Sequence, residues 1–127
     1  MKRTAFILCL LLTAFQTSFA TDKLQSKIDI INLNVNSGLA SNEVTCIVQD
    51  NLGFMWFGTT NGLCRYDGYQ FKTYRSDYLS PSFFVSNHIL LMEKDVEGNL
   101  WIVTTKEFVK FNPVTGRTTP VNMIPIC

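Results

Sequence analysis

The residues that could carry out acid–base, nucleophilic or metal chemistry are few and scattered in this sequence. His88 is the single histidine, and the ten acidic residues fall largely in predicted turns. The sequence has no Cys-x-x-Cys pair, no Cys/His ligand spacing, no Ser-His-Asp order and no nucleophile elbow. A lyase-like site would need a cluster of His and Glu around a metal, which one histidine cannot easily supply. We therefore expect no catalytic residue, no metal, no cofactor and no enzyme activity.

Ligand recognition is the other chemistry that the residue types allow. Tyr78, Phe83 and Phe84 lie in a long loop and could stack on a sugar ring. Polar candidates in turns near them complete the set of predicted ligand-binding residues: Glu43, Asn61, Tyr78, Phe83 and His88. The alternative interpretation is that the aromatic rings cover a core and that the polar side chains are solvated turn residues.

The first twenty residues are typical of a secretory signal peptide. Lys2 and Arg3 precede an apolar run over Ala5–Phe15, and Ser18-Phe19-Ala20 supplies the small residues of a cleavage site. The run is about half the length of roughly twenty residues that a spanning helix needs, although an uncleaved anchor is the alternative. We expect a mature chain that begins near Thr21 outside the cytoplasm, with no membrane span after the signal.

Cysteines outside the cytoplasm meet an oxidising compartment. The predicted mature chain has three of them, Cys46, Cys64 and Cys127. They are interpreted as small buried hydrophobes, with a Cys46–Cys64 bridge as the alternative.

Composition limits the chain to one small folded unit or a piece of a larger one. It has 127 residues, a net charge of +1 and 13% aromatic residues. A near-neutral charge argues against nucleic acid as a partner, and the aromatic content argues against a disordered tail.

The sequence repeats itself at an offset of 45 residues without a gap. The matched pairs are Ser41-Asn42 with Ser86-Asn87, Asp50 with Asp95, Gly53 with Gly98, Trp56 with Trp101, and Thr59-Thr60 with Thr104-Thr105. Conservative matches fill the positions between them.

Each repeat predicts four short strands separated by turns. Asp50–Gly53 and Asp67-Gly68 are turn signals, and Asn61-Gly62 is the strongest hairpin signal. The predicted strands are Val44–Gln49, Phe54–Thr59, Leu63–Tyr66, Tyr69–Tyr74, Ile89–Glu93, Leu100–Thr104, Phe108–Phe111 and Arg117–Val121.

Four antiparallel strands in about 45 residues indicate a propeller blade. The fold class is therefore all-β: an incomplete propeller of two four-stranded blades plus an N-terminal strand. Trp56 and Trp101 are expected to fill the wedges between blades, and Ile28–Asn34 resembles a fourth strand that would close a ring. The domain boundaries follow as 1–20, 21–37, 38–80 and 81–127.

Strand order also predicts which loops share a face. The loop before each first strand and the turn between the second and third strands lie on one side. That face holds Asn42, Glu43, Asn61, Gly62, the Ser76–Asn87 loop and Lys106-Glu107. We expect Ser41-Asn42 and Ser86-Asn87 to bond local backbone rather than a ligand.

The repeat resembles the two-component regulator propeller repeat. The resemblance rests on the runs Gly38–Asn42, Val44–Asp50, Gly53–Thr59 and Gly62–Gly68, and it extends over about Ile28–Val121. The repeat positions that carry it are Asp50, Gly53, Trp56, Gly62, Asp67, Gly68, Asp95, Gly98 and Trp101. The second repeat lacks the Gly-Leu and Tyr-Asp-Gly elements of the first.

The resemblance implies the periplasmic sensor region of a Bacteroides-type hybrid two-component histidine kinase. Such sensors typically recognise oligosaccharides, so an oligosaccharide ligand is implied. The sequence has two blades and no kinase, and we interpret it as an N-terminal fragment whose partners are the remaining blades. The alternatives are a secreted module that assembles with other copies of itself and a lyase-like propeller enzyme.

Overall fold

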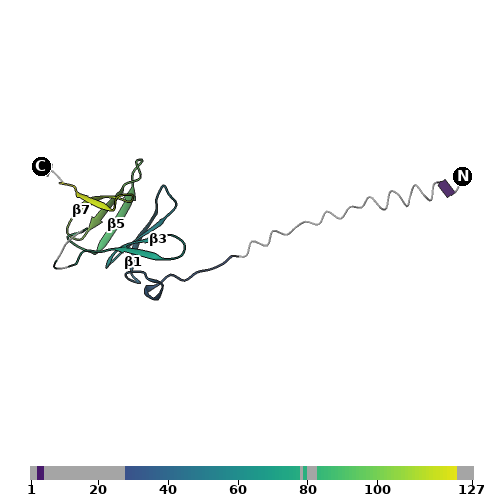
Figure 1. The fold of residues 1–127 in the computed structure, drawn as a ribbon, viewed down its shortest axis with the longest axis horizontal. Coiled ribbons are helices and arrows are strands. Elements are labelled where there is room, and N and C mark those ends of the chain that lie inside the picture. Colours follow the sequence, from purple (N-terminus) through teal and green to yellow (C-terminus); the bar gives the residue numbers. More distant parts are fainter. Residues whose placement is uncertain (1–2, 5–27, 78, 80–82, 123–127) are drawn as a thin grey trace. The chain divides into compact units, whose positions relative to one another are not determined.

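The computed structural model of this chain describes residues 3–4, 28–77, 79 and 83–122. The chain divides into two units, Met1–Ile30 and Ile31–Cys127. All strands of the described residues lie in the second unit, where they form two separate sheets (Figure 1).

The first sheet is an antiparallel blade with the order β1-β2-β3-β4. Its strands are β1 (Val44–Gln49), β2 (Met55–Thr59), β3 (Gly62–Tyr66) and β4 (Phe71–Tyr74). The second sheet repeats the pattern as β5-β6-β7-β8. Its strands are β5 (Ile89–Lys94), β6 (Leu100–Thr104), β7 (Phe108–Asn112) and β8 (Arg117–Pro120). The prediction of an all-β chain with two four-stranded blades is confirmed, with strand ends shifted by one or two residues.

The hairpin predicted at Asn61-Gly62 is present, but it lies one residue earlier. Thr59 pairs with Gly62, so the residues between the strands are Thr60 and Asn61. A type I′ Asn-Gly turn needs positive φ at both central residues. Among the described residues only glycines have positive φ, and Gly62, with φ 121°, is the first residue of β3.

Residues 28–34 form no strand in the structure; a 3-10 helix, η1 (Val35–Ser37), follows them. A strand is defined by its ladder, and the described chain offers this segment no sheet partner. The role of Ile28–Asn34 as a ring-closing strand therefore stays a prediction.

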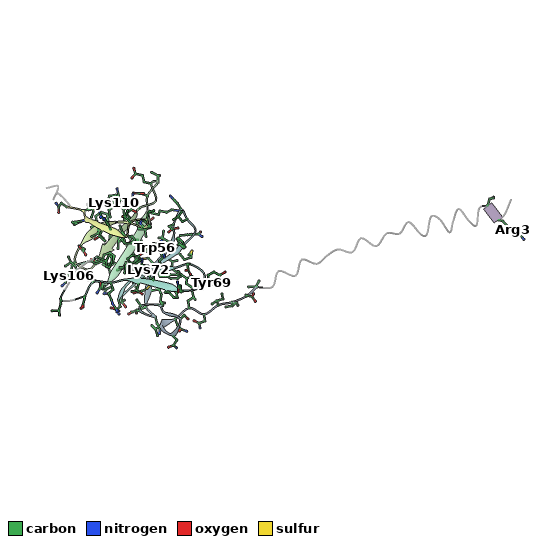
Figure 2. The ribbon with its side chains drawn as sticks, in the orientation of Figure 1. Arg3, Trp56, Tyr69, Lys72, Lys106 and Lys110 are labelled. Carbon is green, nitrogen blue, oxygen red and sulfur yellow. The ribbon has the colours of Figure 1, made fainter. Side chains whose placement is uncertain are left out.

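The core lies at the seam between the two blades. Trp56 of β2 is fully buried, and its ring lies 5.5 Å from that of Tyr74 and 5.2 Å from that of Phe111. Phe111 belongs to the second blade, so the predicted role of Trp56 as a wedge is confirmed. Figure 2 shows Trp56 among the strands of this unit.

Trp101 differs from its repeat partner. It is half-buried, and its ring packs on Phe108 at 5.5 Å with the Lys110 ammonium 5.4 Å from the ring centre. Within the described residues Trp101 therefore fills no core, and its place in a wedge between blades stays a prediction. The physical reason is that no described segment covers this side of the second blade.

An aspartate locks each tryptophan to the turn before its strand. Asp50 Oδ1 accepts the backbone N–H groups of Leu52 and Phe54, and its Oδ2 accepts the Trp56 indole N–H at 2.8 Å. Asp95 repeats the pattern and accepts the Trp101 indole N–H at 2.9 Å. The Asp turn was predicted from the sequence, whereas its bond to the indole was not.

Candidate ligand-binding face

The loops predicted to share one face do converge, at the seam between the blades. Gly62 N–H, at the start of β3, donates to the Asn87 carbonyl just before β5 at 2.7 Å. The Asn87 side chain also holds the end of β4, accepting from Ser76 N–H at 2.9 Å and donating to the Ser76 carbonyl at 2.8 Å. These three bonds tie the turn of one blade to the start of the next.

A shallow polar hollow of about 530 Å³ opens at this junction. Its lining residues are Asn61, Arg75, Ser76, Asp77 and Asn87. Arg75 and Asp77 are exposed on either side of the buried Ser76. A guanidinium, a carboxylate and amides together can donate to and accept from hydroxyl groups, so the hollow has the chemistry to hold a polyhydroxylated ligand.

Of the predicted ligand-binding residues that the structure describes, Asn61 alone lines this hollow. Its amide nitrogen also donates to the Ala40 carbonyl at 3.4 Å. Glu43 and His88 occupy equivalent positions, as predicted: the carbonyl of Glu43 accepts from Thr60 N–H and that of His88 from Thr105 N–H. Both lie outside the hollow's lining.

Phe83 is half-buried and packs edge-on against Tyr74, with ring centres 5.4 Å apart. Its neighbour Phe84 is buried, and both backbone N–H groups donate to the Ser76 hydroxyl. The loop-packing interpretation thus describes Phe83 in this structure. Tyr78 lies outside the described residues, and its ligand role stays a prediction.

Sequence reasoning missed Arg75 and Asp77. Arg75 directly follows β4, and Asp77 lies inside the Ser76–Asn87 loop that the sequence predicts on the ligand face. Membership of that loop could have identified Asp77, and the position directly before the loop could have identified Arg75. The serines of the two Ser-Asn pairs make the local backbone bonds that were predicted: Ser41 and Ser86 accept the N–H groups of Glu43 and His88.

Hydrogen bonds shift the ionisation of two turn aspartates. The Trp101 indole N–H, above all, holds the pKa of Asp95 below its usual value. For Asp67, the backbone N–H groups of Gln70 and then Tyr69 lower the carboxyl pKa. Partial burial raises the pKa of the Cys46 thiol.

Cys46 and Cys64 are both free cysteines in the structure, Cys64 being buried. The interpretation as small buried hydrophobes therefore describes Cys64, and the bridge is not formed. Across the described ranges, no group of three His, Cys, Asp or Glu residues is placed to hold a metal ion.

Comparison with known proteins decides the class of the repeat. A family model described as "Two component regulator propeller" matches residues 38–61, from the loop before β1 to the β2–β3 turn. Residues 38–61 therefore match one such repeat, and the resemblance seen in the sequence is confirmed for this segment.

Similar proteins belong to bacterial signalling systems. The chain is 45% identical over 40 residues to Histidine kinase P4 of Formosa agariphila, covering 32% of this chain and 3% of that protein. It is 30% identical, with a TM-score of 0.66 over 75% of its length, to the extracellular domain of a protein described as the hybrid two component system BT3049 from B. thetaiotaomicron. It is 26% identical, with a TM-score of 0.55 over 68% of its length, to the extracellular domain described as the one component system BT4673 from the same organism.

The chain spans only 14% and 13% of these two extracellular domains. It is therefore a propeller fragment related to the extracellular domains of Bacteroides two-component systems. The described residues build two sheets and contain no kinase module. Within them, no helix has the length and apolar character needed to cross a bilayer.

Proposed function

We propose that this chain is the N-terminal part of a periplasmic, ligand-sensing propeller of a hybrid two-component system, and that its ligand is an oligosaccharide. The observation that carries the proposal is the match to the extracellular domain of BT3049, at 30% identity over 75% of this chain. The first twenty residues act as the signal peptide for export, and the role of the chain is binding rather than catalysis.

The polar hollow at the seam supports a hydroxyl-rich ligand. Its side chains offer charged and neutral hydrogen-bonding groups on a rigid pair of blades. A ligand held there would touch Asn61 of the first blade and Asn87 at the start of the second. Because the two residues come from different blades, a ligand that contacts both can bind only when the blades are packed against each other.

The test is calorimetric titration of the purified chain with a panel of neutral and acidic oligosaccharides. Arg75→Ala is expected to weaken the tightest of them about tenfold, the size of one lost charge-assisted hydrogen bond of about 1.5 kcal/mol. Lys94→Ala is the matched control, because Lys94 is an exposed cation on β5 outside the hollow. No binding to any member of the panel would contradict the ligand class, and equal effects of the two substitutions would contradict the hollow.

A second candidate function is a secreted propeller module that associates with copies of itself. The half-exposed Trp101 on the outer side of the second blade favours it. A lyase-like enzyme has no comparable support.

A further inference from the structure

A second hollow, of about 270 Å³, lies where the two blades meet, and its walls come from both of them. The first blade supplies Arg65 of β3 and Lys72 and Tyr74 of β4, on the front of the blade, the side that carries Trp56. The second blade supplies its β7–β8 turn, residues 113–116. The hollow is therefore built entirely from the described chain, and it shares no lining residue with the polar hollow described above.

Two cations stand side by side in this second hollow. Arg65 and Lys72 occupy directly opposite positions on β3 and β4. Side chains in such positions have Cβ atoms about 5 Å apart, and like charges there repel each other. Among the described residues, no carboxylate lies within 4.0 Å of either cation, and no acidic residue lines the hollow. The positive charge of the pair is therefore not neutralised within the described chain.

The second blade carries an acid that the first blade lacks. Lys110, the repeat partner of Arg65, has the Glu97 carboxylate 4.0 Å from its ammonium. The residue of the first blade that is equivalent to Glu97 is Leu52, whose side chain is 69% exposed. The first blade thus keeps the cation of the repeat without the acid that accompanies it in the second.

Aromatic rings hold both cations in place. The Arg65 guanidinium carbon lies 4.7 Å from the centre of the Phe54 ring, and the Lys72 ammonium lies 5.1 Å from that of Tyr74. The β7–β8 turn packs on Tyr74 in turn, because a Cβ added at Gly116 would lie 3.5 Å from its ring. Cations held on rings lose less conformational freedom on binding a ligand than free side chains do.

Part of the Arg65 guanidinium is shielded from water. Its Nε is buried and has no hydrogen-bond partner among the described residues. A charged group that has lost water without gaining a partner attracts an opposite charge more strongly than an exposed one does. The nearest acid along the chain, Asp67, accepts the backbone N–H groups of Tyr69 and Gln70 and so stabilises its own turn.

We propose that Arg65 and Lys72 form an anion-binding site, which takes an oxyanion (a sulfate, phosphate or carboxylate group) between the two blades. The planar guanidinium suits bidentate binding of such groups, and these charge-assisted hydrogen bonds are among the strong ones in proteins. A bound oxyanion also removes the repulsion between the two cations. A free inorganic anion and an acidic group on a larger ligand both supply this chemistry. The site is separate from the hollow of the proposed function and does not require it.

The test is an NMR titration of the full chain with sodium sulfate, at an ionic strength held constant with sodium chloride. The Arg65 Nε–H signal and the amide signals of the β7–β8 turn should shift with a dissociation constant on the order of 1 mM. Arg65→Gln should weaken sulfate binding about tenfold, and Lys72→Gln about threefold because this ammonium is exposed. Lys94→Gln is the matched control, because it removes the same charge from β5, outside the hollow, and should leave the affinity unchanged.

Leu52→Glu tests the site while both cations are kept. It places a carboxylate at the position that Glu97 occupies in the second blade, so this carboxylate should compete with sulfate and weaken its binding about threefold. Leu52→Gln has nearly the same shape without the charge and should bind sulfate as the wild type does. Equal affinities of the two variants would contradict the site.

A sugar sulfate distinguishes the two sources of the anion. Glucose 6-sulfate is compared with methyl sulfate, which carries the same charged group without the sugar. Tighter binding of glucose 6-sulfate supports the site as one for an acidic saccharide, and equal binding supports it as one for a free anion.

An Arg65 Nε–H signal that sulfate leaves unmoved would overturn the proposal. Equal losses of affinity in Arg65→Gln and Lys94→Gln would overturn it as well, because they would show general attraction to a cationic surface. The readouts belong to this hollow, whereas the proposed function is tested by Arg75→Ala and oligosaccharides. The two proposals can therefore fail separately.

Discussion

At the scale of single residues, the two Asp–Trp pairs are the chemistry that the repeat preserves. Asp50 satisfies two backbone N–H groups and one indole N–H, and it is 7% exposed. Hydrogen bonds to a buried charged acceptor are among the stronger ones in proteins. Each pair fixes a turn and orients a ring with the same carboxylate.

Asp50→Ala is expected to lower the free energy of unfolding by about 3 kcal/mol, because it leaves a buried indole N–H and turn amides unpaired. Asp95→Ala removes the equivalent bonds beside a half-exposed ring, where water replaces them, and should therefore destabilise the chain less. Urea unfolding of the two variants gives the comparison. A larger loss for Asp95→Ala would contradict the difference in burial between the two tryptophans.

The pH dependence of stability follows from the lowered pKa of Asp95 and of Asp67. A carboxyl whose folded pKa lies below its ordinary value of 3.8 stabilises the fold above that value and loses the contribution as pH falls through the folded pKa. The urea midpoint should therefore change little through these groups from neutral pH to about pH 5 and fall below about pH 4. Trp101→Phe removes the indole donor, so the Asp95 pKa should rise toward 3.8 and the acid limb should become shallower. An unchanged Asp95 titration by NMR in that variant would contradict the assigned cause.

Several residue roles could be predicted from the sequence alone. Asp50 and Asp95 precede glycines by three residues, and this local chemistry is enough to identify the turns. The hydrogen bonds from the tryptophan indole N–H groups were not predicted. They depend on the strand after the turn directing the tryptophan side chain back toward the aspartate. Arg75, Asp77 and Phe83 were misjudged or missed because hollows and loop packing depend on contacts between segments far apart in the chain.

At the scale of the element, close approach of β2 to β1 and β5 defines the seam. A Cβ added at Gly58 would lie 2.4 Å from Cys46 Sγ and 2.8 Å from Ile89 Cγ2. Thr45, beside Cys46, donates its hydroxyl hydrogen to the Ile89 carbonyl at 2.8 Å. Gly58 is therefore required by packing rather than by backbone conformation.

Gly58→Ala is expected to destabilise the chain by about 1–3 kcal/mol, because the added methyl group overpacks the seam. The double variant Gly58→Ala/Cys46→Ala should recover a large part of the loss, since it removes the nearer obstacle. A double-mutant cycle in urea measures the coupling. Strictly additive losses would show that the methyl group does not meet Cys46.

The strands of both blades could be predicted from the sequence, but which face of each blade is buried could not. Hydrophobic periodicity and turn residues predict each strand, and they are the same in the two repeats, so they predict the same burial for both. Trp56 is buried and Trp101 half-exposed because the first blade has its neighbour in front and the second has its neighbour behind. No local sequence pattern distinguishes the buried face of the first blade from that of the second.

At the scale of the whole molecule, one seam between the two blades holds the core of the described chain. That seam buries Trp56 and holds the loops around the polar hollow. The proposed binding of a ligand at this hollow depends on the packing of the two blades.

The most direct test is acrylamide quenching of tryptophan fluorescence in Trp101→Phe, where Trp56 is the single fluorophore. We predict that Trp56 is strongly protected from quencher in the folded chain at every protein concentration, because Phe111 of the second blade covers its ring. Phe111→Ala in the same background should raise the quenching constant, while the exposed control Val96→Ala, on the β5–β6 turn, should not. If Trp56 is quenched as readily in the folded chain as in urea, the blades do not pack on each other and the account is wrong.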